Sequence, residues 1–166
     1  MSTSSTGVDP LISRLLTACP ELEEAWTQER TDDQEEPLPY LQASTLAQVV
    51  AAAYSKGQTA CFAALFSDVE SLVITGTPEE QELVVAGFLE DLQGAMGWAG
   101  LEADAIREWL GPKSRDAWDG LIEMWKDIAK KKASGELPPG PFDTQLPDMK
   151  DSKLMKIFRS IQRPPT

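Results

Sequence analysis

Apolar residues recur at intervals of three and four positions along most of the chain, which is the spacing of one helical face. Runs of this kind lie at residues 11–16, 22–26, 46–54, 62–73, 85–96, 106–110, 118–128 and 154–161. The pattern predicts an all-α fold. We expect a compact multi-helix bundle of about seven helices, with a tethered C-terminal amphipathic helix.

Helix starts are marked by capping residues and prolines. Asp9 followed by Pro10 places a capping carboxylate before a proline at the first helical position. Thr77, with Glu80 three residues later, forms the pattern of a capping box. Ser44 is the expected N-cap of the helix that covers residues 46–54.

The stretch 71–75, Ser-Leu-Val-Ile-Thr, is rich in residues that are also common in β-strands. A lone strand has no partner to complete its hydrogen bonds in a chain whose other segments are helical. We therefore expect this stretch to be helical.

Composition divides the chain into four parts. We expect a disordered N-terminus at 1–8, an acidic helical bundle at 9–133, a Pro/Gly-rich connector at 134–147, and a basic amphipathic helix with its tail at 148–166. The last helix has four apolar residues in one stripe and four basic residues assigned to the other face: Leu154, Ile157, Phe158 and Ile161, and Lys150, Lys153, Lys156 and Arg159. It either docks on its own bundle or forms an arm that binds a partner or a second copy.

Negative charge is concentrated in the first two thirds of the chain. The net charge is −12, but residues 1–110 hold 19 acidic and 4 basic side chains, whereas residues 111–166 hold 8 and 11. An acidic body repels nucleic-acid phosphates and attracts basic proteins. We expect a basic protein as partner and no direct nucleic-acid binding, although acidity can also serve solubility alone.

Residue types needed for most catalytic sites are missing. The chain has no histidine, and it shows neither a glycine-rich phosphate loop nor the calcium-loop spacing in its acidic segment at 32–36. We expect no enzyme activity, no cofactor and no metal. Cys19 and Cys61 lie in apolar helical surroundings and are expected to be buried free thiols, with a disulfide or a reactive thiol as the alternative.

The N-terminus lacks both a basic region and an apolar run, and no stretch approaches 18 consecutive apolar residues. We therefore expect a cytoplasmic protein with no membrane role. Three of the five tryptophans, Trp109, Trp118 and Trp125, lie on apolar helical faces. Core packing is the expected role of these three, and an exposed interface anchor is the alternative.

Two segments resemble a known family. The pattern Phe88-Leu89-Glu90-x-Leu92, followed by Leu110-Gly111-Pro112-x-Ser114, is similar to the core of a group of small, uncharacterised bacterial α-helical proteins. Pro20-Glu21-Leu22 with Trp26 resembles the N-terminal segment of the same group. The resemblance covers roughly residues 10–125 and implies the helical fold and a bacterial origin. It implies no activity.

These observations favour a binding protein. The leading hypothesis is an inhibitor, such as a bacterial immunity protein that neutralises a basic toxin by electrostatically steered capping. An adaptor that engages a partner through the helical body or the C-terminal helix is the first alternative, and a carboxylate-based enzyme is the second. The partner-binding residues are expected among two groups of carboxylates: Asp32, Asp33, Glu35 and Glu36, and Glu79, Glu82, Glu90 and Asp91. The sequence leaves the oligomeric state open.

Overall fold

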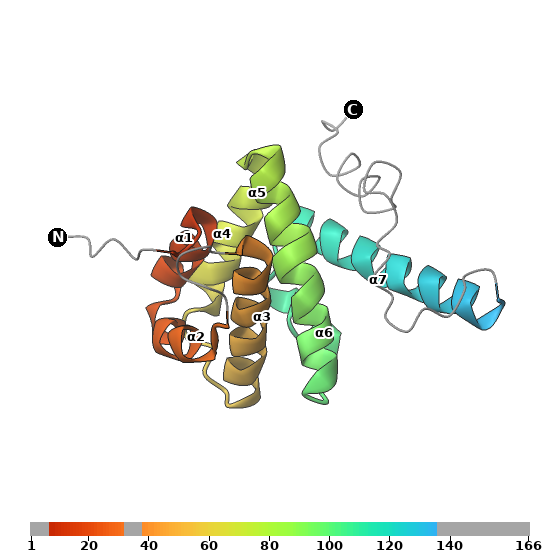
Figure 1. Cartoon of the computed structure of the whole chain (residues 1–166), viewed down its shortest axis with the longest axis horizontal. Helices are drawn as coiled ribbons and strands as arrows, with labels where there is room; N and C mark the ends of the chain where they lie inside the picture. The colour runs from red at the N-terminus through yellow and green to blue at the C-terminus, as the bar shows by residue number, and fades with distance from the viewer. Residues whose placement is uncertain (1–6, 32–37, 136–166) are drawn as a thin grey trace.

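Helices account for the regular structure in residues 7–31 and 38–135, which are the residues that the computed structural model describes (Figure 1). In chain order the elements are α1 (Pro10–Ala18), the 3₁₀ turn η1 (Pro20–Leu22), α2 (Glu23–Glu29), α3 (Pro39–Ser55), α4 (Phe62–Thr75), α5 (Pro78–Glu82), the π-helical η2 (Leu83–Leu89), α6 (Glu90–Trp98), the 3₁₀ turns η3 (Ala103–Ala105) and η4 (Arg107–Trp109), and α7 (Pro112–Ala133). These described ranges contain no strand. The expected all-α fold is confirmed, including helix at 71–75.

Two of the three helix caps predicted from the sequence are present in the structure. The Asp9 carboxylate accepts the Leu11 N–H at 2.9 Å and so caps α1. Thr77 and Glu80 form the reciprocal capping box at the start of α5, with distances of 3.2 and 3.0 Å. The expected N-cap at Ser44 is wrong: α3 already begins at Pro39, and Ser44 lies inside the helix. Proline at the first helical position starts α3, because its fixed φ angle suits that position.

The segments α5, η2 and α6 follow one another without a break and form one long helix (Figure 1). Within η2 the backbone adopts i→i+5 hydrogen bonding, shown by the Glu90 N–H that donates to the Val85 carbonyl. Gly87 lies in this segment and lets α3 approach closely. A Cβ there would lie 3.2 Å from the Ala43 Cβ and 3.4 Å from a ring atom of Tyr40.

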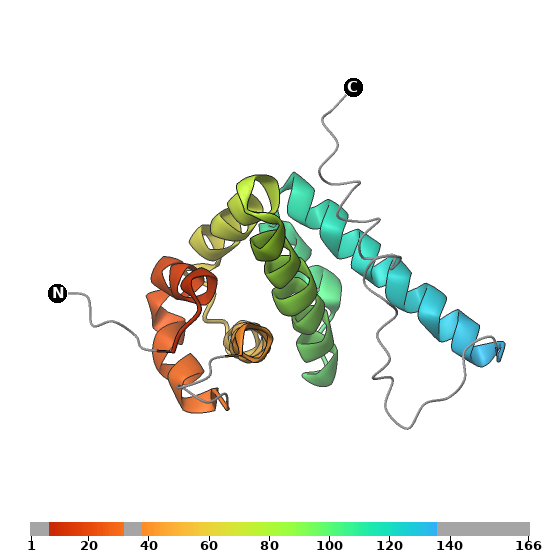
Figure 2. The ribbon, with the colours of Figure 1, turned by 45° about the horizontal axis from the view of Figure 1, so that its top comes forward.

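The core lies around α3 and α4. Figures 1 and 2 both show α3 between α2 on one side and α6 on the other. The largest fully buried side chains come from all parts of the described chain: Ile12, Leu15, Trp26, Leu46, Phe62, Phe66, Phe88, Leu92 and Trp118. The stripe expected at 85–96 is buried as predicted.

The buried side chain of Gln42 ties the N-terminal segment to α3. Its carboxamide accepts the Asp9 N–H at 2.8 Å and donates to the Gly7 carbonyl at 2.7 Å. Its backbone carbonyl accepts the Trp26 indole N–H at 3.1 Å. Each of these buried polar groups therefore has a partner, as burial requires.

Helix α7 is capped by a side chain from α4. The Glu70 carboxylate accepts the backbone N–H groups of Lys113 and Ser114 at 2.8 and 2.9 Å. Gly111, the N-cap residue, has no side chain to do this, and a Cβ there would overlap the Glu70 carboxylate. The Leu-Gly-Pro-x-Ser pattern therefore has a structural role: it leaves room for the carboxylate that fixes the start of α7 on α4.

Two further expectations need correction. Trp125 was expected in the core, yet it is 42% exposed, because α7 extends beyond the other helices and buries only residues of its first half (Figures 1 and 2). In place of the short helix expected at 106–110, the structure has the 3₁₀ turn η4, which follows the separate 3₁₀ turn η3. Trp118 is fully buried, as expected, and Trp109 is half-buried against the rings of Tyr54 and Phe62.

Cys19 and Cys61 are paired in a disulfide, which overturns the expectation of two free thiols. Cys19 ends α1 and Cys61 precedes α4, and the packing of these helices brings the two Cα atoms to 5.2 Å. Disulfides persist mainly in oxidising compartments. The cytoplasmic location therefore stays a prediction.

The expected connector and C-terminal helix lie almost wholly outside the described residues, since 136–166 are not among them. Within the described ranges, no helix is long and apolar enough to cross a membrane.

Candidate functional site

The predicted partner-binding carboxylates fall into two sets. Four of them lie outside the described residues: Asp32, Asp33, Glu35 and Glu36. Glu79 is exposed in the first turn of α5. The other three are half-buried along the same long helix, at Glu82, Glu90 and Asp91, and all three lie close to α3.

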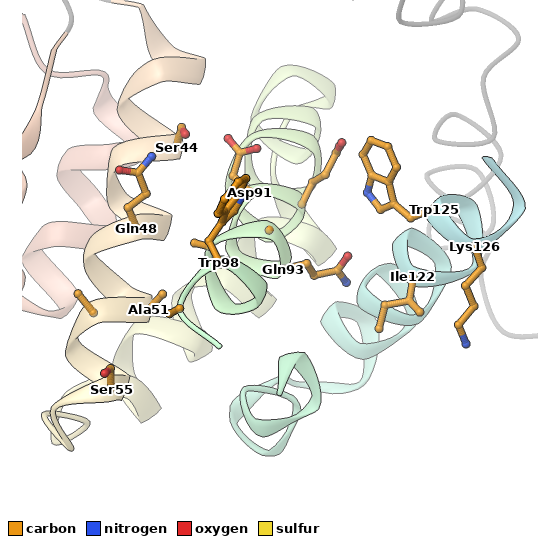
Figure 3. A pocket seen from close by; sticks show the side chains of 15 residues that line it. Ser44, Gln48, Ala51, Ser55, Asp91, Gln93, Trp98, Ile122, Trp125 and Lys126 are labelled. Atoms are coloured by element: carbon orange, nitrogen blue, oxygen red, sulfur yellow. The ribbon is translucent and has the colours of Figure 1, made fainter. Parts of the chain in front are cut away.

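An open groove lies along α6, with α3 on one side and α7 on the other (Figure 3). Its volume is about 1000 Å³. We call it the α6 groove, and its main lining residues are Ser44 and Ala51 of α3, Glu90, Asp91, Gly94 and Trp98 of α6, and Ile122 and Trp125 of α7. Two of the predicted carboxylates thus line a concave surface.

Glu90 and Asp91 form the acidic end of this groove. Burial, followed by the charge of Asp91, raises the pKa of Glu90 to about 7. Burial also raises the pKa of Asp91, and a hydrogen bond from Ser44 partly offsets that effect. Among the ion pairs of the described residues, none includes Glu90 or Asp91. A cation placed beside them would relieve the cost of holding negative charge where water is partly excluded.

Tyr40 extends the acidic end toward the start of α3. Its pKa is raised to about 12, chiefly by burial, then by the charge of Glu82, with which it shares a hydrogen bond, and also by the charge of Glu90. Leu38 and Leu41, next to Tyr40 in the sequence, are both exposed. The carboxylates therefore lie beside apolar side chains that solvent can reach.

Sequence reasoning missed Trp98, and it expected Trp125 in the core with an exposed interface anchor only as the alternative. Trp98 is 94% exposed, and Trp125 leans from α7 toward α6 (Figure 3). Trp98 does not share the buried stripe of its own helix, and it stands among Gly94, Gly97 and Gly100. A large aromatic residue among glycines was the available signal. Exposed tryptophans of this kind are enriched at the centres of protein interfaces.

The chemistry that this arrangement offers is mainly that of binding. A carboxyl group with a pKa near 7 could exchange a proton with a bound group. No cluster of three or more His, Cys, Asp and Glu side chains suited to a metal occurs among the described residues. The groove combines two half-buried carboxylates with exposed indole rings, and this combination suits a ligand that is both cationic and apolar.

Comparisons with known proteins give one match. Residues 12–126 match a protein family that carries the description "Domain of unknown function (DUF7674)". No curated protein and no solved structure matches the chain. The matched range includes every lining residue of the α6 groove, and it agrees with the uncharacterised family expected from the sequence. The chain therefore belongs to the DUF7674 family, a domain family of unknown function.

Proposed function

We propose that this chain is a protein-binding inhibitor that caps a basic partner at the α6 groove. The observation that carries the proposal is that the half-buried carboxylates Glu90 and Asp91 line the same groove as the exposed Trp98. The leading form is an immunity protein that neutralises a basic toxin.

Charge supports the first part of the proposal. The excess of acidic residues in 1–110 attracts a basic protein over distances of about 8 Å at physiological salt, and it speeds the encounter. Once the partner is bound, a lysine or arginine beside Glu90 and Asp91 donates hydrogen bonds to these carboxylates, which burial has partly removed from water. Charge-assisted hydrogen bonds of this kind contribute more than those between neutral groups.

Exposed apolar side chains support the second part. Trp98, Trp125 and the half-buried Ile122 add apolar surface to the same groove. Burial of such side chains at an interface supplies most of the affinity, while charge supplies steering and specificity. We therefore expect the partner to insert an apolar side chain flanked by cations.

An adaptor role is favoured by a separate observation. Leu38, Tyr40 and Leu41 are each between 44% and 50% exposed at the start of α3, so a second contact surface is available. An inhibitor abolishes its partner's activity in a one-to-one complex, whereas an adaptor leaves that activity intact.

Photo-crosslinking in the native host tests the proposal. A benzophenone amino acid in place of Trp98 should capture a basic protein, and the same probe in place of Glu24 is the control. Glu24 is exposed on α2, on the other side of α3 from α6 (Figure 1). Capture at Trp98 should fall at least tenfold in the variant Glu90→Lys/Asp91→Lys. The matched reversal Glu24→Lys/Glu29→Lys, which changes the net charge equally, should have little effect.

Two results would contradict the proposal. One is capture at Trp98 that Glu90→Lys/Asp91→Lys leaves unchanged, and the other is a captured protein that is acidic. Once the partner is known, its activity at increasing amounts of this chain separates inhibition from an adaptor role.

A further inference from the structure

The α6 groove is open on a chain whose C-terminal 31 residues lie outside the described structure. We propose that residues 148–163 of the same chain dock in the α6 groove and occupy it until a partner displaces them. This inference rests on the proposed function, because it assigns the resting occupant of the same binding site.

The groove has the apolar surface that such a segment needs. Trp98 and Trp125 are 94% and 42% exposed on either side of a surface formed by small residues of α6. A Cβ added at Gly94 would meet no heavy atom within 4 Å, so space above this part of α6 is free. Four apolar residues spaced as one helical stripe follow in the C-terminal segment, at Leu154, Ile157, Phe158 and Ile161.

Charge fixes the orientation. Lys150 precedes Leu154 by four residues and Lys153 precedes Ile157 by four, and this spacing brings both lysines to the edge of the stripe and not to the opposite face to which the charge pattern alone assigned them. A helix docked through its stripe therefore carries these two cations beside the groove. The acidic end of the groove offers Glu90 and Asp91, neither of which is in an ion pair within the described residues. Lys126, the basic residue that lines the groove, pairs with Glu123 of its own helix at 3.6 Å.

The connector is long enough to return to the groove. From Lys126 to the end of α7 at Ala133 the helix advances about 10 Å, at about 1.5 Å per residue. Residues 134–147 can span about 45 Å when extended. A segment tethered in this way has an effective concentration in the millimolar range, so an intrinsic affinity of about 100 μM would keep the groove mostly occupied.

The family match ends at residue 126, so the groove belongs to the shared domain and the docking segment does not. This division is the one expected if the segment regulates access to a common binding surface.

Hydrogen exchange on the full-length chain, without any partner, tests the inference. Two glycines of α6 provide matched variants, because a Cβ at Gly94 or at Gly97 would meet nothing within 4 Å, and only Gly94 lines the groove. Gly94→Arg places bulk and positive charge in the groove, and Gly97→Arg makes the same change outside it. Circular dichroism checks that both variants keep the wild-type helix content.

The amides of 154–161 should exchange at least tenfold more slowly than an unfolded peptide in the wild type and in Gly97→Arg, equally at 5 and 200 μM protein. In Gly94→Arg this protection should be lost. Equal exchange in the wild type and in Gly94→Arg would overturn the inference, whether the segment is protected elsewhere or not at all. Protection found only at 200 μM would also overturn it, because it would show that the segment docks on a second copy of the chain. Since no partner is present, none of these outcomes decides the proposed function, which the crosslinking at Trp98 tests by itself.

Discussion

The contact between Glu70 and the start of α7 allows a sharp test of how this fold is held together. The carboxylate accepts two backbone N–H groups that otherwise have no partner within the helix. Replacing a conventional N-cap side chain costs about 0.5–2 kcal/mol, and hydrogen bonds to a charged group contribute about 1.5–3 kcal/mol. The residue is half-buried, so we expect Glu70→Ala to lower the free energy of unfolding by about 2–3 kcal/mol.

Gly111 makes the prediction specific. Its φ of −72° suits any residue, so glycine is needed there for space and not for backbone freedom. We therefore expect Gly111→Ala to destabilise the wild type by about 1–3 kcal/mol, because the new methyl group displaces the Glu70 carboxylate. In the Glu70→Ala background the same change should cost less than about 0.5 kcal/mol, because nothing remains to be displaced.

Urea unfolding followed by circular dichroism at 222 nm gives all four free energies of this double-mutant cycle. Glu70→Gln keeps one acceptor oxygen and should retain about half of the stabilisation. Additive effects of Glu70→Ala and Gly111→Ala, or a cost of Glu70→Ala below about 0.5 kcal/mol, would refute the reasoning.

Three further predictions follow from burial, pKa and disulfide pairing. Trp118→Ala should cost about 3–5 kcal/mol in a urea unfolding experiment and Trp125→Ala less than about 1 kcal/mol, because only Trp118 is fully buried; similar costs would show that the exposure of Trp125 is wrong. Burial raises the pKa of the Glu90 carboxyl to about 7 in the empty groove, and a bound cation lowers it again, so the partner-bound state holds fewer protons. The affinity for the captured basic partner should therefore rise severalfold from pH 5.5 to pH 8, and it should change less in Glu90→Gln; a steeper rise in Glu90→Gln would contradict this cause. The unfolded, non-reduced chain should show no free thiol with Ellman's reagent, and reduction should lower the free energy of unfolding by about 3–4 kcal/mol, given that 42 residues separate Cys19 from Cys61; two reactive thiols would exclude the disulfide and favour the cytoplasmic expectation.

The candidate site was partly visible in the sequence. Glu90 and Asp91 were among the predicted carboxylates, and the structure places both in the α6 groove. Trp98 was not predicted, because a pattern of apolar spacing identifies the buried face of a helix and is silent about an apolar residue on the opposite face. The raised pKa of Glu90 could not be predicted either, since it arises chiefly from burial in the folded chain.

The sequence by itself determined what depends on residues within about four positions of one another. The all-α class, the caps at Asp9 and Thr77 and the buried stripe at 85–96 follow from hydrogen bonds and side-chain spacing inside a single helix. Only the tertiary structure decided which of these helices meet. The pairing of Cys19 with Cys61 and the capping of α7 by Glu70 join residues 42 to 44 positions apart. The exposure of Trp125 has the same origin. An apolar stripe indicates which face of a helix is suited to burial, but the length and position of the neighbouring helices decide how much of that face is buried.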